Sequence, residues 1–459
     1  MDDNIEFSVV AKALELLDDK NFFELRNLLE EQNPADINDI IDELSDEKSF
    51  VIYRLLPKEL AAEVFVEMDS DKQEYLINLF SDSQLKDVFE ELYYDDTADI
   101  IEEMPASVVK RILKIVSPDM RKAVNELLKY PDDCAGSIMT TEFVRLKKSY
   151  TVAESLEFIR SVGVNKETIY TCYVTDDKNH LIGIVTAKDL LLSELSETIS
   201  EIMEDNVISV TTLEDTEEVT LMFGKYDFLA LPVVDKENRL VGIITVDDAI
   251  DVMQEEADED LAMISAVTPG DTEYLKTSVF KLWASRIPWL MILMISATFT
   301  GMIISKFESA LAVLPILTAF IPMLMGTGGN AGSQASVTVI RGISLGQVEF
   351  SDIFKVLWKE CRVSVLCGII LCIAAIGKVM LVDNLLMNNP DVSIFVALVV
   401  GITLFATIVS AKLIGCALPL IAKRIGLDPA VMASPLITTL IDTVSLLVYF
   451  YFASLILNI

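Results

Sequence analysis

Residues 428–450 read DPAVMASPLITTLIDTVSLLVYF, and the apolar run that begins at Ala430 continues to Leu457. A helix of this length crosses the roughly 30 Å of hydrocarbon in a bilayer. The run contains one acid, Asp442, about twelve residues into the span, which at ~1.5 Å per residue is ~18 Å deep. Thr438 and Ser445 share its helical face. Because a charge near the bilayer centre is costly and functional by default, Asp442 is the predicted transport residue.

Four further apolar stretches predict an all-α transmembrane domain of five helices over residues 282–459. Together the spans are expected at 283–304, 309–326, 363–382, 392–413 and 430–457. Lys378 and Lys412 lie nearer the ends of their spans, where long cationic side chains can reach the interface. An ion pair between one of these lysines and Asp442 is the structural alternative to a transport role.

The second stretch runs into PMLMGTGGNAGSQAS at 322–336. Irregular backbone at membrane depth is tolerated where it lines a cavity or is packed in protein. We therefore expect an irregular, cavity-lining segment around Gly328, Gly329 and Asn330, whose carbonyls and amides would suit a partly hydrated divalent cation. A glycine-rich cytoplasmic turn and close helix packing are the alternatives.

The basic residues predict the orientation in the membrane. They gather before the first span, between the second and third, and between the fourth and fifth, whereas Asp383 and Asp391 lie in an alternate connection. The positive-inside rule then places the N-terminus in the cytoplasm and, with five spans, the C-terminus outside. The acidic start MDDNIEF has no signal-peptide pattern, which agrees with this orientation. The predicted location is the cell membrane.

Charge is segregated along the chain. The 459 residues include 36 Lys and Arg against 71 Asp and Glu, a net charge of −35, although 52% of residues are hydrophobic and the mean hydropathy is +0.44. Residues 1–280 carry 63 acids and 25 bases, a net charge of −38, whereas residues 281–459 carry a net charge of +3. This excludes a nucleic-acid binder, which needs a basic face. It favours a membrane protein with a large aqueous part.

Residues 33–130 repeat with a period of 24. Ile41, Phe65, Phe89 and Leu113 occupy one repeated position, and the apolar spacing within each unit is that of an amphipathic helix. Repeated helix pairs that share apolar faces predict an α-solenoid over the N-domain, residues 1–132. A generic helical bundle is the alternative.

A second duplication relates LIGIVTAKD at 181–189 to LVGIITVDD at 240–248. The pattern resembles tandem cystathionine-β-synthase (CBS) domains, which implies an α/β pair over residues 133–196 and 197–257. In that family the Thr and Asp of this stretch often hold a nucleotide ribose, which here implies Thr186 with Asp189 and Thr245 with Asp248. ATP or another adenine nucleotide is thus a candidate ligand, although many such pairs bind none.

Acids are dense from Asp247 to Asp260 and recur at helical spacing without interleaved bases. A solvated helix face is the usual explanation of such a run. However, the solenoid holds another unpaired cluster at Asp95, Asp96 and Asp99, and self-repulsion destabilises a compact domain of this charge. Hard divalent cations bound by carboxylates would relieve the repulsion. The pattern therefore predicts an electrostatic, metal-responsive element.

The chain resembles the MgtE family of magnesium channels and transporters in the two membrane motifs at 322–336 and 428–450, the CBS pair and the acidic helical N-domain. The resemblance implies a homodimer in the lipid membrane, a central pore that holds hydrated Mg²⁺ at Asp442, and a connecting "plug" helix at 258–281. It also implies closure when cytosolic Mg²⁺ rises. The implied pore-lining residues are Gly328, Gly329, Asn330, Ser434, Pro435 and Thr438. The implied cytosolic sensor residues are Glu63, Asp95, Asp96, Asp99, Asp227, Asp248, Asp251, Glu256, Glu259, Asp260 and Asp428. Ser434 stands where the family commonly has Asn.

The predicted function is Mg²⁺ uptake down the electrochemical gradient, without enzymatic activity. The sequence has no GxxxxGK[ST] motif, so primary pumping is not expected. A divalent cation exchanger coupled to H⁺ or Na⁺ through Asp442 is one alternative. A membrane-anchored CBS nucleotide sensor is another, although it leaves Asp442 unexplained. Oxygen ligands do not by themselves select Mg²⁺ over Co²⁺, Mn²⁺ or Ni²⁺.

Overall fold

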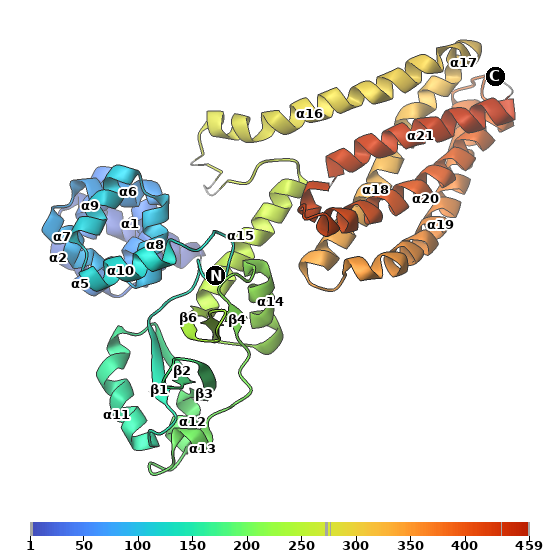
Figure 1. Ribbon diagram of the computed structural model, residues 1–459. Helices are drawn as coiled ribbons and strands as arrows, with labels where there is room; N and C mark the ends of the chain where they lie inside the picture. Colours follow the sequence, from blue (N-terminus) through green and yellow to red (C-terminus); the bar gives the residue numbers. More distant parts are fainter. Residues whose placement is uncertain (1–2, 271–273, 276, 433, 458–459) are drawn as a thin grey trace. The chain divides into compact units, whose positions relative to one another are not determined.

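The computed structural model describes residues 3–270, 274–275, 277–432 and 434–457 (Figure 1). The chain forms two compact units, Met1–Val252 and Met253–Ile459. The first contains a helical domain and two small β-sheets, and the second is helical in its described residues. The predicted order of a helical N-domain, an α/β pair and a helical region with long apolar helices is confirmed.

The first unit begins with short helices arranged in pairs. They are α1 (Asp3–Asp18), α2 (Phe22–Glu30), α3 (Pro34–Asp42), α4 (Asp46–Tyr53), α5 (Lys58–Val66), α6 (Ser70–Leu79), α7 (Asp82–Phe89), α8 (Tyr94–Glu103), α9 (Ala106–Ile115) and α10 (Pro118–Leu127). Helices α3, α5, α7 and α9 begin at 34, 58, 82 and 106, and the alternate helices from α4 to α10 begin at 46, 70, 94 and 118. The structure thus follows the 24-residue period.

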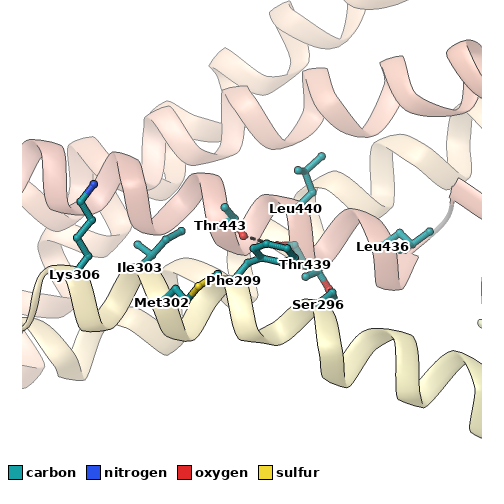
Figure 2. A pocket seen from close by; sticks show the side chains of 9 residues that line it. All are labelled: Ser296, Phe299, Met302, Ile303, Lys306, Leu436, Thr439, Leu440 and Thr443. Carbon is teal, nitrogen blue, oxygen red and sulfur yellow. Dashed lines mark hydrogen bonds between the residues drawn. The ribbon is translucent and has the colours of Figure 1, made fainter.

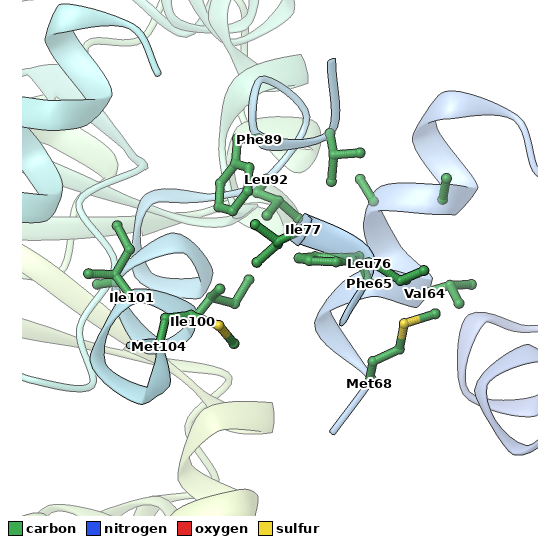
Figure 3. Packing of buried hydrophobic residues seen from close by; sticks show 14 of the residues in the cluster. Val64, Phe65, Met68, Leu76, Ile77, Phe89, Leu92, Ile100, Ile101 and Met104 are labelled. Carbon is green, nitrogen blue, oxygen red and sulfur yellow. The ribbon is translucent and has the colours of Figure 1, made fainter. Parts of the chain in front are cut away.

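The repeated apolar positions form the core of this domain (Figure 3). Phe65 and Phe89 are equivalent in successive repeats, both are fully buried, and their ring centroids lie 6.1 Å apart in an edge-to-face arrangement. Leu76 and Ile100 are likewise equivalent and buried. Each repeat therefore buries its apolar face against its neighbour, which is how a solenoid is stabilised.

Two three-stranded sheets follow. The elements are β1 (Phe143–Lys147), α11 (Val152–Val162), η1 (Gly163–Asn165), β2 (Thr168–Thr175), β3 (Leu181–Thr186), α12 (Ala187–Leu192), α13 (Ile199–Ile202), β4 (Val210–Thr211), α14 (Thr216–Tyr226), β5 (Ala230–Val234), β6 (Leu240–Thr245) and α15 (Val246–Ile264), which continues into the second unit. The strand orders are β1-β2-β3 and β4-β5-β6, each with one parallel and one antiparallel pair.

The duplicated halves interlock. Gly183 lies against the Met203 side chain, and its counterpart Gly242 lies against Met139, the residue equivalent to Met203. A side chain at either glycine would collide with a methionine that opens the other copy. The two repeated glycines therefore permit the close approach of the copies.

The second unit is a helical bundle. Its elements after α15 are α16 (Val279–Lys306), α17 (Glu308–Val313), η2 (Pro315–Phe320), α18 (Ile321–Ser344), η3 (Phe350–Asp352), α19 (Ile353–Lys378), the π-helical η4 (Val379–Leu386), α20 (Ile394–Arg424), η5 (Pro429–Met432) and α21 (Ser434–Leu457). Helix α20 is central, since it packs against α18, α19 and α21. Helix α16 contacts α21, and none of its residues, all of which are described, is buried.

Two predicted helices differ from the structure. Residues 309–326 are not one span, because α17, η2 and the start of α18 divide them. The expected connecting helix at 258–281 is also not continuous, since α15 ends at Ile264 and α16 begins at Val279. Among the described residues, helices long and apolar enough to cross a membrane lie at Val279–Lys306, Phe350–Leu386, Ile394–Arg424 and Pro429–Leu457. Helix α18 is also long, but it is rich in glycine and small polar residues.

Candidate ion pathway and cytosolic cation sites

Asp442 lies on α21 beside the seam between α21 and α18. One turn before it, Thr438 contacts Gly329, where an added Cβ would lie 3.0 Å from the Thr438 methyl group. One turn after it, the buried Ser445 hydroxyl lies 3.0 Å from the Cβ position of Gly328. The structure thus brings two of the predicted glycines against the helical face that carries Asp442.

The glycines of α18 form a close helix-packing face. The expectation of an irregular backbone is wrong, because α18 is helical from Ile321 to Ser344. A Cβ at Gly328 would lie 2.6 Å from the Thr407 methyl group, and one at Gly332 would collide with Ile441. Gly415 on α20 approaches the Gly332 carbonyl so closely that it has no room for a side chain. Small residues let the helices approach, and tertiary packing overrides the low helix propensity of glycine.

The predicted pore residues lie on different sides of their helices. Gly328 and Gly329 are buried, whereas Asn330 is exposed on the uncovered side of α18 together with Gly326 and Gln334. On α21 the Pro435 carbonyl accepts hydrogen bonds from the hydroxyls of Thr438, at 2.9 Å, and of Thr439, at 3.0 Å. The side chain of Ser434 is outside the described residues.

The two lysines proposed as alternative partners of Asp442 have other partners. Lys378 Nζ lies 2.8 Å from Asp383 Oδ2. Lys412 Nζ lies 3.6 Å from Glu360 Oε2, and its side chain is only 9% exposed, so the expectation that Lys412 reaches the membrane interface is wrong. Asp442 is half-buried and has no hydrogen bond or ion pair to the part of the chain that the structure describes.

A groove of about 600 Å³ lies between α16 and α21 (Figure 2). Its lining residues are Ser296, Phe299, Met302, Ile303, Lys306, Leu436, Thr439, Leu440 and Thr443. The Ser296 hydroxyl donates to the Thr439 hydroxyl at 3.4 Å, but the rest of the wall is mostly apolar. Asp442 does not line this groove, which therefore is not the candidate ion site.

An acidic cluster in the first unit joins the N-domain to the CBS pair. Asp95 and Asp96 begin α8, Asp99 follows one turn later, and Asp248 begins α15. Glu167, which precedes β2, faces the same cluster, although no sequence pattern indicates it. Only the fold could reveal Glu167, because it lies far from the other acids in the sequence and outside any acidic run.

Crowding and burial weaken the acidity of these carboxyls. Burial, with the neighbouring charge of Asp248, raises the pKa of Asp96 to about 6. Burial and the charges of Asp96 and Asp248 raise the pKa of Glu167 to about 8. The pKa of Asp95 is also raised, and its buried Oδ1 atom has no partner among the described residues. The carboxylates therefore repel one another, and none of Asp95, Asp96, Asp248 and Glu167 has an ion pair with a Lys or Arg among the described residues.

A second acidic pair lies within the second unit. Asp260, on the last turns of α15, accepts a hydrogen bond from the Ser344 hydroxyl at 2.8 Å. Burial raises the pKa of Asp260, and the charge of Asp428 raises it further. The hydrogen bond from Ser344 lowers it and so opposes both effects. Asp428 in turn accepts from the Ala430 amide at 2.7 Å at the start of η5. These two predicted sensor residues are thus near neighbours.

The remaining predicted sensor residues are more scattered. Glu63 is exposed on α5, and Asp227 caps α14 with a φ of 55°. Asp251 lies near Glu67, whose pKa is raised by burial and by the Asp251 charge. Glu256 and Glu259 lie farther along α15. Within the described residues, no three Asp, Glu, His or Cys side chains converge closely enough to hold a metal ion.

The nucleotide-binding candidates serve as helix caps. Thr186 and Asp189 form a reciprocal capping box at the start of α12, with their side chains 2.5 Å apart. The Thr245 hydroxyl donates to Asp248 at the same distance. Each pair therefore has a structural role, and Asp248 also belongs to the acidic cluster.

Comparisons with known proteins cover most of the chain. The divalent cation transporter domain of MgtE matches residues 321–452, the MgtE intracellular N domain matches 32–133, and CBS domains match 135–195 and 199–255. The chain is 36% identical to the magnesium transporter MgtE of Thermus thermophilus, over 99% of this chain and 100% of that protein. It is 32% identical to the magnesium transporter MgtE of Bacillus subtilis, over 97% of each.

A solved structure resembles the part of the chain that contains the helical N-domain and the two sheets. It is the cytosolic domain of the Mg²⁺ channel MgtE in complex with ATP, and it is 38% identical with a TM-score of 0.51. The match covers 53% of this chain and 99% of that one.

Proposed function

Because the chain belongs to the MgtE family of magnesium transporters, we propose that Asp442 binds Mg²⁺ as the ion crosses the membrane. The observation that carries this proposal is the isolation of Asp442, a half-buried membrane carboxylate whose candidate lysine partners are paired elsewhere. An unpaired charge at this depth is costly, so it requires a function. Binding a divalent cation supplies the missing counter-charge.

The driving force is the membrane potential. Moving a dication inward gains roughly 4.6 kcal/mol per 100 mV, twice the value for a single charge. Mg²⁺ retains several waters and needs only one or two carboxylates. A single Asp442 per chain, surrounded by hydroxyls and backbone, therefore suits a mostly hydrated ion. The family transports magnesium and is not a family of enzymes.

The pore is proposed to form in a homodimer of five-span subunits, in which α18 replaces the predicted span at 309–326. The N-terminus is proposed to lie in the cytoplasm and the C-terminus outside. Gly326, Asn330 and Gln334 form a small and polar stripe on α18 that is exposed in the single chain. Such a stripe does not suit lipid, because polar groups need partners in the hydrocarbon region. A second subunit and a hydrated pore would cover it. Ser434 and Pro435 at the start of α21 would shape the cytoplasmic end.

Cytosolic Mg²⁺ is proposed to close the pore. The clusters around Asp96 and Asp248 and around Asp260 and Asp428 hold carboxylates whose pKa values are raised by burial and mutual charge. Cations would relieve this repulsion and hold the elements together, with waters completing the coordination. At low Mg²⁺ the repulsion would separate them. The scattered residues Glu63 and Asp227 would contribute only if these elements rearrange.

A nucleotide site in the CBS pair is a second candidate. It is favoured by the 38% identical cytosolic domain that was solved with ATP. Thr186, Asp189, Thr245 and Asp248 are the candidate contacts. Because Asp248 would serve both ligands, adenine-nucleotide binding is expected to depend on Mg²⁺. Equilibrium dialysis with ATP, at zero and at millimolar Mg²⁺, would test this proposal.

Flux through Asp442→Asn in proteoliposomes tests the pore assignment. This variant keeps the shape of the side chain and removes its charge, so Mg²⁺ entry under an inside-negative potential should fall at least 100-fold. Asp391→Asn, which removes an exposed acid from the connection before α20, is the matched control and should conduct normally. Undiminished flux through Asp442→Asn at equal incorporation would refute the assignment.

Flux measurements in the same proteoliposomes distinguish a channel from the two alternative functions, an exchanger and a nucleotide sensor. Flux that requires an imposed H⁺ or Na⁺ gradient would identify an exchanger, and nucleotide binding without any flux would identify a sensor. Competition by Co²⁺, Mn²⁺ and Ni²⁺ would measure selectivity, to which Ser434 is a candidate contributor.

A further inference from the structure

A polar contact joins the end of α15 to the end of α18 that is expected to face the cytoplasm. The Ser344 hydroxyl, on the last residue of α18, donates to Asp260 Oδ2 at 2.8 Å. Both residues are partly buried. Hydrogen bonds to an ionised acceptor are about twice as strong as neutral ones. The contact therefore supplies a specific attachment that involves no cation.

Apolar contacts support the same attachment. Met263 and Ile264 pack against the buried Ile340 of α18 and the buried Ala430 of η5. These contacts bury surface but are not directional. The Ser344 hydrogen bond is directional and favours the turn of α15 that carries Asp260, which lies close to Asp428.

The carboxylate of Asp260 needs this donor because its surroundings oppose its charge. It is partly buried, and the charge of Asp428 is close enough to disfavour ionisation further. Asp428 is oriented by the Ala430 amide at 2.7 Å. Without Ser344, repulsion between the two carboxylates would push the end of α15 away from η5 in the absence of a cation.

We propose that Ser344 is a positioning residue that holds the end of α15 on α18 before any cation binds. The inference rests on the proposed closure by cytosolic Mg²⁺. The apparent affinity for Mg²⁺ is proportional to the fraction of molecules in which α15 is already attached to α18. An attachment that forms without a cation therefore lowers the Mg²⁺ concentration needed for closure. Asp260 then remains in place to share a hydrated cation with Asp428.

The test is amide exchange of residues 256–264 in the full-length protein in lipid nanodiscs. In EDTA, Ser344→Ala should increase exchange of this segment roughly tenfold, the effect of losing one hydrogen bond to a charged group. The Mg²⁺ midpoint for restoring protection should rise by up to the same factor. Ser344→Thr keeps the hydroxyl, so its exchange rate in EDTA and its Mg²⁺ midpoint should match those of the wild type.

Thr338→Val is the matched control, because it removes a hydroxyl from the same helix. That hydroxyl donates to Gln334 within α18, at 2.7 Å, so exchange of residues 256–264 should not change. The proposal is overturned if Ser344→Ala exchanges like the wild type in EDTA, if its Mg²⁺ midpoint is unchanged, or if Thr338→Val has the same effect. Exchange does not depend on flux. Normal flux through Asp442→Asn would therefore refute the pore assignment and leave this result intact.

Discussion

Asp442 and Glu360 are both carboxylates of the helical bundle, but their surroundings differ. Glu360 faces the buried Lys412 ammonium group at 3.6 Å, whereas Asp442 has no ionic partner among the described residues. Glu360 is thus neutralised within the chain, and Asp442 is not. The difference indicates that Glu360 and Lys412 belong to the structure of the bundle, while Asp442 is available for a cation from solution.

The acidic clusters around α8 and α15 extend this comparison. There the negative charge is shared, since Asp96, Asp248 and Glu167 repel one another. A single carboxylate binds a cation weakly, so the ion can dissociate again, as conduction requires. Several acids from separate elements suit an ion that holds those elements together. The position and number of the acids thus distinguish the proposed transport site from the proposed regulatory sites.

The largest effect on stability is expected at the structural pair. Lys412→Met should destabilise the protein by about 3–5 kcal/mol, because it leaves the Glu360 carboxylate buried without a counter-charge. The double variant Lys412→Met/Glu360→Leu should recover most of this loss. Thermal unfolding in detergent would measure both. If the single variant unfolds like the wild type, Glu360 and Lys412 are not a structural pair, and the contrast with Asp442 fails.

A smaller loss is expected where α18 meets α20 and α21. Gly332→Ala should destabilise by about 1–3 kcal/mol, since its Cβ would collide with Ile441 and force the helices apart. Flux should fall as well, because the displaced face of α21 carries Asp442. Gly377→Ala on α19 is the matched control, as no atom lies within 4 Å of its Cβ position. Equal stability of the two variants would argue against close packing at this seam.

The sequence predicted the elements that depend on local pattern or duplication. The 24-residue spacing of Phe65 and Phe89 anticipated the helical repeats, and the LIGIVT and LVGIIT stretches anticipated the paired sheets. Sequence-based prediction was wrong where the structure depends on contacts between segments that are distant in the chain. Gly328 and Gly329 predict an irregular backbone because the sequence does not show that they pack against α20 and α21. Likewise, no local pattern connects Lys412 to Glu360 or Glu167 to Asp96.

The smallest effect concerns pH at the cytosolic cluster. Unfolded carboxyls have pKa values near 4, and the folded pKa is raised to about 6 for Asp96 and about 8 for Glu167. The folded cluster therefore binds more protons than the unfolded chain between pH 4 and 8, and it loses stability as pH rises through this window. Without Mg²⁺, lowering the pH from 8 to 6 should stabilise α8 on the order of 1–2 kcal/mol. Amide exchange of residues 94–103, corrected for the intrinsic pH dependence, measures this gain.

Mg²⁺ should reproduce the effect of protons, because both remove the same repulsion. Protection of residues 94–103 by Mg²⁺ is expected to be large at pH 8 and small at pH 6, where protons already occupy the carboxyls. Glu167→Gln should flatten the pH dependence, whereas Glu157→Gln on the neighbouring α11 should leave it unchanged. If Mg²⁺ protects equally at both pH values, the cation does not act on these carboxyls. Regulation would then depend on the acids along α15 instead. The carboxylate cluster would only destabilise the folded protein through its mutual repulsion.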